Sequence, residues 1–364
     1  MNADALIDGS INNWKETTLG QLITLHYGKA LKTENRLKGD IPVYSSAGLT
    51  GYHNEALFAG KGIVVGRKGT VGKAYLTELP FWCIDTAYYI LPDNQKYEFK
   101  YLYYLLRTLG LEELNEDSAV PGLNRDTAYQ QQFLLPPLPE QKAIAAVLSS
   151  LDGKIDLLHR QNKTLEAMAE TLFRQWFIEE AKEDWEKCCL GDCVTISYGR
   201  NLPTKNLVLE GYPVFGANGQ IGFFTNYTYL DPQVLVSCRG EASGVVNISL
   251  AKSYITNNSL VLERNKKQII SFEFLKYWAL SYDFNLHVSG SAQPQITIDG
   301  LYDAILNLPD EHLIRSYSSI VFHFEQKRSF NVQQIQTLEK LRDNLLPKLM
   351  SGEVRVSYEQ QDAA

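Results

Sequence analysis

Cysteine and long apolar runs are both scarce in this chain of 364 residues. Its five cysteines are an odd number in a long chain, which provides no disulfide framework and suits a reducing compartment. No run of eighteen apolar residues occurs, and the N-terminal residues lack the basic start and apolar core of a signal peptide. We therefore expect a soluble protein of the cytoplasm.

Positive charge is also in deficit. Lysine and arginine number 35 against 42 aspartates and glutamates, which gives a formal net charge of −7. Affinity for duplex DNA comes mostly from neutralising phosphates, so the composition argues against a nonspecific nucleic-acid coat. If the protein binds DNA, its basic residues must be concentrated locally, or a partner must supply them.

Catalytic and metal-binding motifs are missing from the sequence. There is no Gly-x-Ser-x-Gly, His-Glu-x-x-His or dinucleotide-binding fingerprint. Residues 66–73 contain the glycines and lysine of a phosphate loop, but Arg67 and Ala74 occupy positions where that motif needs Gly and Ser or Thr. Cys188, Cys189 and Cys193 have no nearby histidine to complete a zinc site, and we interpret them as packing positions. We expect a chain without catalytic residues, metal or cofactor.

The middle of the chain carries a coiled-coil pattern, in which apolar residues return at alternating steps of four and three. Its seam positions are Leu148, Leu151, Ile155, Leu158, Asn162, Leu165 and Leu172. A 3.5-residue repeat keeps one stripe facing a partner helix, and a polar residue at an a position such as Asn162 fixes the register. The pattern, which extends from Pro139 to Phe177, predicts a helix about 55 Å long that acts as a spacer, and we assign residues 140–182 to this segment.

The chain also repeats itself. Residues 19–20 and 27–29 recur 171 positions later as Leu-Gly and Tyr-Gly-Arg, and small insertions raise the offset to 173 further along. The repeat predicts a second long helix over residues 311–352, with Ile335, Leu338 and Leu345 on its seam. The two helices are joined by a whole domain, so they can pair antiparallel with each other; pairing with another chain is the alternative.

The segments before the two helices have the same mixed character. Short β-branched runs such as residues 62–65 and 233–236 are bounded by Gly or Asp-Pro and are followed by helical patterns. We therefore predict an α+β fold with two similar domains, at residues 1–139 and 183–310, separated by long helices that form an antiparallel coiled coil. Residues 353–364 are expected to form a flexible tail.

Several turns recur in both repeats of the sequence with the same spacing, while their hydrogen-bonding residues differ. Asn and Gln suit adenine and Arg suits guanine in the major groove, so two like domains that read different DNA sequences would show this pattern. Drift in surface loops would produce it equally well. The DNA-contact candidates are Ser45, Arg67, Lys68, Thr70, Asn124 and Arg125 in the first domain, and Asn218, Arg239, Glu241, Ser243, Gln293 and Gln295 in the second.

The arrangement of domain, long helix, domain and long helix resembles the specificity (S) subunit of type I restriction-modification enzymes. The resemblance is carried by Leu-Pro-Pro-Leu-Pro-Glu-Gln-Lys at residues 135–142, the Leu-Gly and Tyr-Gly-Lys openings, and the Arg-Lys-Gly-Thr-Val-Gly turn at residues 67–72. It implies that each domain recognises one half of a split double-stranded DNA site, and that the chain itself is not an enzyme.

The resemblance also implies partners. Two methyltransferase (M) subunits would dock on the coiled coil, restriction (R) subunits would join through M, and no membrane would be involved. S-adenosylmethionine, ATP and Mg would bind only in those partner subunits. The alternative function is a non-DNA scaffold that binds protein or glycan through two like domains on a coiled coil.

Overall fold

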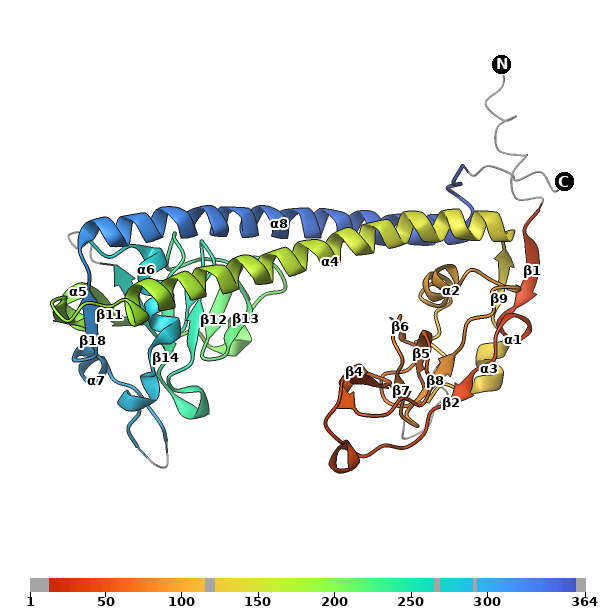
Figure 1. Ribbon diagram of the computed structural model, residues 1–364, viewed down its shortest axis with the longest axis horizontal. Coiled ribbons are helices and arrows are strands. Elements are labelled where there is room, and N and C mark those ends of the chain that lie inside the picture. The colour runs from red at the N-terminus through yellow and green to blue at the C-terminus, as the bar shows by residue number, and fades with distance from the viewer. Residues whose placement is uncertain (1–12, 115–121, 265–268, 291–292, 358–364) are drawn as a thin grey trace, which may run out of the picture. The chain divides into compact units, whose positions relative to one another are not determined.

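The computed structural model describes residues 13–114, 122–264, 269–290 and 293–357 (Figure 1). The chain divides into two compact units: unit 1 comprises residues 1–157 and 334–364, and unit 2 comprises residues 158–333. Each unit therefore combines one strand-rich domain with part of each long helix. None of the described helices is both long enough and apolar enough to cross a membrane.

The first domain is built from small sheets. β1 (Lys15–Thr18) pairs with β9 (Gln132–Leu135). The four-stranded sheet has the order β2 (His26–Tyr27), β8 (Ala87–Ile90), β5 (Gly62–Gly66), β6 (Ala74–Thr77). A three-stranded sheet has the order β4 (Gly48–His53), β3 (Ile41–Ser45), β7 (Trp82–Cys83). Its helices are α1 (Leu19–Leu22), α2 (Phe99–Leu106) and α3 (Arg125–Tyr129).

The second domain repeats this plan. β10 (Glu186–Cys189) pairs with β18 (Ile305–Leu308). The four-stranded sheet has the order β11 (Val194–Tyr198), β17 (Ser259–Arg264), β14 (Val234–Ser237), β15 (Val246–Ile248). The three-stranded sheet has the order β13 (Gly219–Phe224), β12 (Tyr212–Gly216), β16 (Tyr254–Ile255). With α5 (Leu190–Cys193), α6 (Phe272–Ser281) and α7 (Ile298–Tyr302), the sequence repeat is a structural repeat, and the predicted α+β fold is confirmed.

The core of each unit joins its domain to the long helices. In unit 1, buried residues of the sheet and of α2 pack in one cluster with residues of α4 (Leu138–Arg174) and α8 (Glu311–Ser351), among them Ile63, Tyr101, Leu148 and Leu349. β5 is buried along its whole length, as expected for the short β-branched run that the sequence shows there. The domain and its part of the helix pair therefore share one hydrophobic core.

The two long helices run antiparallel within each unit. In unit 1, Arg342 of α8 donates to Asp152 of α4 at 2.8 Å. In unit 2, Asn331 donates to Asn162 at 2.9 Å and Arg328 lies 3.1 Å from Glu166. As residue numbers rise along α4, those of the partners on α8 fall. The chain thus supplies both strands of an antiparallel coiled coil, as predicted.

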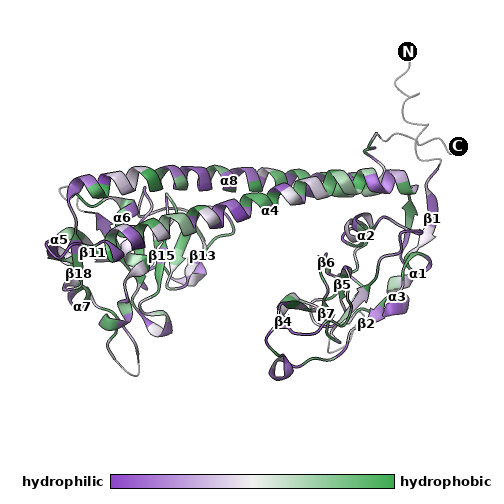
Figure 2. Ribbon diagram, in the orientation of Figure 1, coloured by the Kyte–Doolittle hydropathy of each residue, from purple (hydrophilic) through white to green (hydrophobic). Residues whose placement is uncertain are grey.

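The seam positions face inward on both helices. Figure 2 shows polar and apolar residues alternating along α4 and α8. Leu148, Ile155, Leu158 and Ile335 are buried. The remaining seam residues are half-buried: Leu151, Asn162, Leu165, Leu172, Leu338 and Leu345. α8 ends just before Gly352, whose positive φ of 77° makes it a suitable C-terminal stop.

Asn162 and Asn331 form a polar layer in the seam. Asn331 is fully buried, so replacing Asn162 alone with leucine should remove its hydrogen-bond partner and lower the free energy of unfolding by about 1–3 kcal/mol. Replacing both with leucine should restore or exceed the stability of the native chain, because an apolar layer packs without desolvating amides. Urea unfolding of the single and double variants measures this. A single variant as stable as the native chain would show that the hydrogen bond makes no net contribution, and a double variant no more stable than the single variant would contradict the gain from an apolar layer.

Two segments differ from the sequence-based expectation. Cys188 and Cys193 form a disulfide, so the prediction that the cysteines provide no disulfide framework was wrong for this pair. The short helix α5 folds the chain between them and brings their Cα atoms within 7.0 Å, although both also pack in the core as expected. Residues 353–357, the described part of the predicted tail, pack against unit 1 through Val354 and Val356, and Arg355 forms an ion pair with Glu140.

Candidate functional site

Two loops that are distant in the sequence lie side by side in each domain. One follows the buried strand β5 or β14, and the other precedes the short helix α3 or α7. In the first domain the Leu123 amide donates to the Arg67 carbonyl at 2.8 Å, and in the second the Ile296 amide donates to the Cys238 carbonyl at 3.1 Å. β-bridges join Lys68 to Gly122 and Arg239 to Gln295. We call residues 67–70 with 122–125 the first loop pair, and residues 238–243 with 293–298 the second.

The first loop pair lines a pocket of about 440 Å³. Four of the six residues proposed for DNA contact in this domain border it: Arg67, Lys68, Asn124 and Arg125. The structure therefore brings together positions almost sixty residues apart in the chain. Positive charge is concentrated locally, as a DNA-binding surface on an acidic protein requires.

Tyr27 forms a platform in this pocket. The guanidinium carbons of Arg67 and Arg125 lie 5.0 Å and 5.3 Å from its ring centroid, within the range of cation–π attraction. Arg67 also donates to the Asp85 carbonyl at 3.0 Å. Tyr27 is 51% exposed, so the arginines are fixed on an aromatic ring that is open to solvent. Planar guanidinium groups held in this way can bind phosphates or guanine edges bidentately.

Tyr88 packs against Tyr27 and supports its ring. Its ring packs edge to face against Tyr27 with centroids 5.1 Å apart, and its hydroxyl donates to the Leu123 carbonyl at 3.2 Å. Burial, together with the neighbouring Tyr27, raises the pKa of Tyr88 to about 12, so the hydroxyl keeps its proton at neutral pH. This bond ties the base of the pocket to the second stretch of the loop pair.

Glycine makes the tight turn after β5 possible. A Cβ atom on Gly66 would lie 1.9 Å from the Thr70 carbonyl oxygen, and one on Gly72 would lie 2.3 Å from the backbone of Leu111. Gly72 also has a positive φ of 75°, which side chains disfavour. Gly66 and Gly72 therefore allow a close backbone turn that presents Arg67 and Lys68.

The residue before each short helix caps it. Asn124 Oδ1 accepts from the Asp126 amide at 2.8 Å, and Thr297 Oγ1 accepts from the Gly300 amide at 3.1 Å. Asn124 is exposed, and its amide nitrogen is the group that can face a ligand. The helix cap thus fixes where α3 starts and places Arg125 beside Tyr27.

Three hydroxyl residues among the predicted contacts lie at less accessible positions. Ser45 and Ser243 are each 7% exposed, and their hydroxyls donate to the carbonyls of Gly48 and Pro294. Thr70 is half-buried in the turn after β5. These residues shape the loops, and their contact with DNA stays a prediction.

The second loop pair has the same backbone arrangement as the first but carries different side chains. Its exposed candidates are Arg239, Glu241, Gln293 and Gln295, and Asn218 is exposed in the turn between β12 and β13. Among the side chains of the first pocket, Arg67 is replaced by Cys238, Arg125 by Ile298 and Tyr88 by Leu260. Leu260 pairs with Val236 as Tyr88 pairs with Val65. The second domain therefore presents amides, one guanidinium and the carboxylate of Glu241 where the first presents two guanidiniums on tyrosine.

The sequence reasoning missed Tyr27 and Tyr88 as site residues. Tyr27 did carry a signal, because it recurs as Tyr198 in the repeated Tyr-Gly motif, but it served only as a marker of the repeat. Tyr88 belongs to a buried strand, and nothing in its local sequence distinguishes it from a core residue. Among the residues that the structure describes, no group of three or more His, Cys, Asp or Glu side chains could hold a metal ion.

Comparison with known proteins identifies relatives along most of the chain. The family model for the type I restriction modification DNA specificity domain matches twice, at residues 11–167 and 182–340. The type I restriction enzyme MjaIX specificity subunit of Methanocaldococcus jannaschii is 28% identical over 71% of this chain and 69% of its own. A putative type I specificity subunit of Mycoplasma genitalium is 21% identical over 93% and 94%.

A solved structure supports the same fold. The crystal structure of the type I restriction-modification S subunit from M. genitalium covers 94% of this chain and 97% of its own, with a TM-score of 0.63 and 22% identity. Each of the two family matches spans one strand-rich domain together with part of a long helix, and each contains one of the loop pairs described above. With its repeated domains and antiparallel long helices, the chain belongs to the family of type I restriction-modification DNA specificity proteins.

Proposed function

We propose that this specificity protein reads a two-part DNA site, with one loop pair contacting each part, within a type I restriction-modification enzyme. The observation that supports this most strongly is the pair of equivalent backbone bonds, from Leu123 to Arg67 and from Ile296 to Cys238. They hold the same frame in both domains, while the exposed side chains on that frame differ. Two readers with one architecture and different side chains are suited to two different half-sites.

The side chains indicate how each half is read. Arg67 and Arg125, held on Tyr27, suit guanine edges or phosphates, and Lys68 supplies a further cation. Gln293 and Gln295 suit adenine, which a glutamine side chain can contact through two hydrogen bonds. The function of the chain is positional, and it contributes no catalytic group.

The chemistry belongs to partner subunits in this proposal. Two M subunits dock on the coiled coil and share the phosphate contacts, which offsets the net charge of −7. M flips an adenine out of each half-site for methylation, and R subunits join through M. S-adenosylmethionine, ATP and Mg bind in those subunits. The helices α4 and α8 serve as a ruler that keeps the two readings about one turn of duplex apart, about 34 Å.

Replacing Arg67 and Lys68 with alanine tests the first loop pair. We expect the assembled methyltransferase to bind its duplex about 10- to 100-fold more weakly, and the slope of log affinity against log salt to flatten by about one for each phosphate that the protein no longer neutralises. Electrophoretic mobility shifts at several salt concentrations measure both. If the affinity falls while the slope is unchanged, the two side chains bind bases; if neither changes, the loop pair is not the interface.

Arg107→Ala is a matched control for this test. Arg107 also stacks on a tyrosine of unit 1, with its guanidinium carbon 5.6 Å from the Tyr103 ring, but it lies outside the loop pair. Its replacement should leave DNA binding and salt dependence unchanged. An equal loss of affinity in both variants would indicate a general electrostatic effect and would contradict the proposed site.

A further inference from the structure

A carboxylate joins three elements in unit 1. The Tyr104 hydroxyl of α2 donates to Asp152 Oδ2 on α4 at 2.5 Å, and Arg342 Nη1 of α8 donates to Asp152 Oδ1 at 2.8 Å. Tyr104 is 2% exposed, and the Arg342 side chain is only 17% exposed. Asp152 therefore connects a helix of the domain to both helices of the coiled coil. We call this set the unit 1 node.

Unit 2 contains the equivalent arrangement. The positions 173 residues after Tyr104 and Asp152 are Tyr277 and Glu325, and the Tyr277 hydroxyl donates to Glu325 Oε1 at 3.1 Å. Lys276 Nζ lies 2.6 Å from the same oxygen. Arg328 donates to Glu325 at 3.0 Å and lies 3.1 Å from Glu166 on α4. We call this set the unit 2 node; it again connects a domain helix to both long helices.

The side chains of the nodes hold the protonation states that their hydrogen bonds require. Burial raises the pKa of Tyr104 and Tyr277, helped by the carboxylate each one faces, so both remain donors at neutral pH. Desolvation opposes ionisation of Glu325, but the lysine and arginine beside it lower its pKa overall, so it stays an acceptor. Hydrogen bonds to a charged partner are roughly twice as strong as neutral ones.

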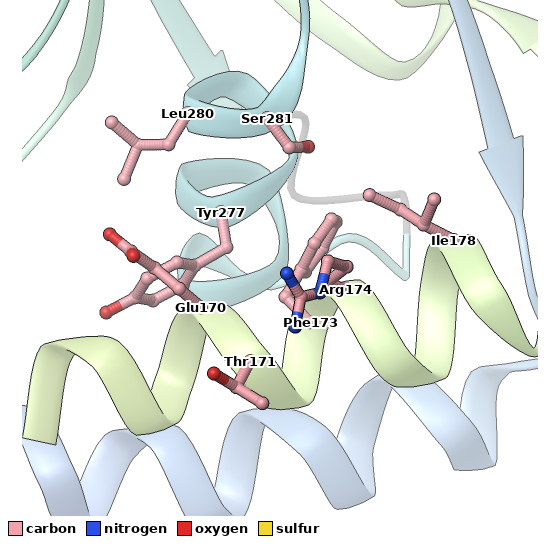
Figure 3. A pocket seen from close by; sticks show the side chains of 8 residues that line it. All are labelled: Glu170, Thr171, Phe173, Arg174, Ile178, Tyr277, Leu280 and Ser281. Carbon is pink, nitrogen blue, oxygen red and sulfur yellow. The ribbon is translucent and has the colours of Figure 1, made fainter.

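The position of Tyr277 shows why a hydroxyl matters here. Figure 3 shows Tyr277 extending from α6 along α4, beside Glu170. These residues border a cavity of about 320 Å³, together with Phe173, Arg174 and Leu280. Because the Tyr277 hydroxyl donates to Glu325 on α8, the polar node forms part of the contact that holds α6 against the long helices.

We infer that Tyr104 with Asp152, and Tyr277 with Glu325, are positioning residues that set the orientation of each DNA-reading domain on the coiled coil, and thereby the gap between half-sites that the protein accepts. This inference rests on the proposed function. Neither pair lies in a loop pair, so the bases read should be independent of them. Loosening a node lets a domain swing on its helix pair, which changes where the loops meet the duplex.

The test uses full-length Tyr104→Phe and Tyr277→Phe chains, each assembled with the M subunits and expressed in a host whose methylome is sequenced. Each variant removes one hydroxyl and keeps the ring in the core. We expect the same half-site sequences to be methylated. Methylation at sites whose gap is one base pair longer or shorter should rise about tenfold relative to the native gap, the effect of losing one charge-assisted hydrogen bond.

Tyr103→Phe is the control, because it removes the neighbouring hydroxyl on α2 outside the node. If either node variant keeps the native gap preference, its node does not position the domain, whether or not thermal stability falls. If the recognised bases change, the node acts on reading itself and the inference is wrong. If the native complex methylates no two-part site, the proposed function fails first, which separates the two failures.

Discussion

Replacing Glu140 with alanine is expected to lower the free energy of unfolding by about 3–5 kcal/mol, the cost of breaking a buried ion pair. Glu140 is fully buried, and Arg355 Nε and Nη2 donate to its two oxygens at 2.5 Å and 2.8 Å. Trp14 Nε1 donates to it at 3.0 Å. Removing the carboxylate takes away the acceptor that the Arg355 guanidinium and the Trp14 indole N–H share in a partly desolvated site.

Calorimetry and urea unfolding measure this loss, with the exposed Glu16→Ala in the same unit as control. The double variant Glu140→Leu with Arg355→Leu should lose less stability than Glu140→Ala, because apolar replacement removes both charges together. Leucine also occupies the equivalent position of the second repeat, Leu313. An alanine variant within about 1 kcal/mol of the native chain would show that the pair makes no net contribution.

Removing one heptad from each long helix is expected to abolish methylation of the native two-part site. Deleting residues 155–161 and 332–338 preserves the seam pattern and the Asn162–Asn331 and Asp152–Arg342 pairs. The ruler becomes shorter by about 10 Å. That corresponds to about three base pairs, over which the duplex turns by about 100°, so the two loop pairs no longer face the same side of the native site.

Methylome sequencing of a host expressing the shortened complex measures whether the native two-part site is still methylated. Assembly with the M subunits, followed by size-exclusion chromatography, shows whether the shortened chain still folds. A native-length chain with Ile155→Leu and Ile335→Leu alters the same two segments without changing their length, and should keep the native gap. Continued methylation at the native gap by an assembled, shortened complex would refute the ruler.

The sequence predicted the architecture well because its signals are periodic or repeated. The seam from Leu148 to Leu172 needs only a 3.5-residue spacing to indicate a coiled coil, and the 171- to 173-residue offset transfers that prediction to α8. Arg67 and Lys68 were proposed as contact residues because they follow a strand and lie between glycines. These features are local, so they can be recognised without knowing what lies nearby in space.

The tertiary structure decided which residues meet. Tyr27 and Tyr88 looked like a repeat marker and a strand residue, and only packing placed two arginines over the Tyr27 ring. The Cys188–Cys193 disulfide depended on how α5 folds the chain. Ser45 has a hydroxyl that could contact DNA, yet only the three-dimensional structure shows that this side chain is buried within a turn.

Residue order alone is enough to establish two like domains and two long helices, because helix periodicity and internal repetition can be recognised directly in the sequence. It could not determine the node at Asp152, which joins Tyr104 of α2 and Arg342 of α8, or the buried ion pair between Glu140 and Arg355. Those contacts join residues 48 to 215 positions apart. The burial and charge that make them strong arise only when the helices pack.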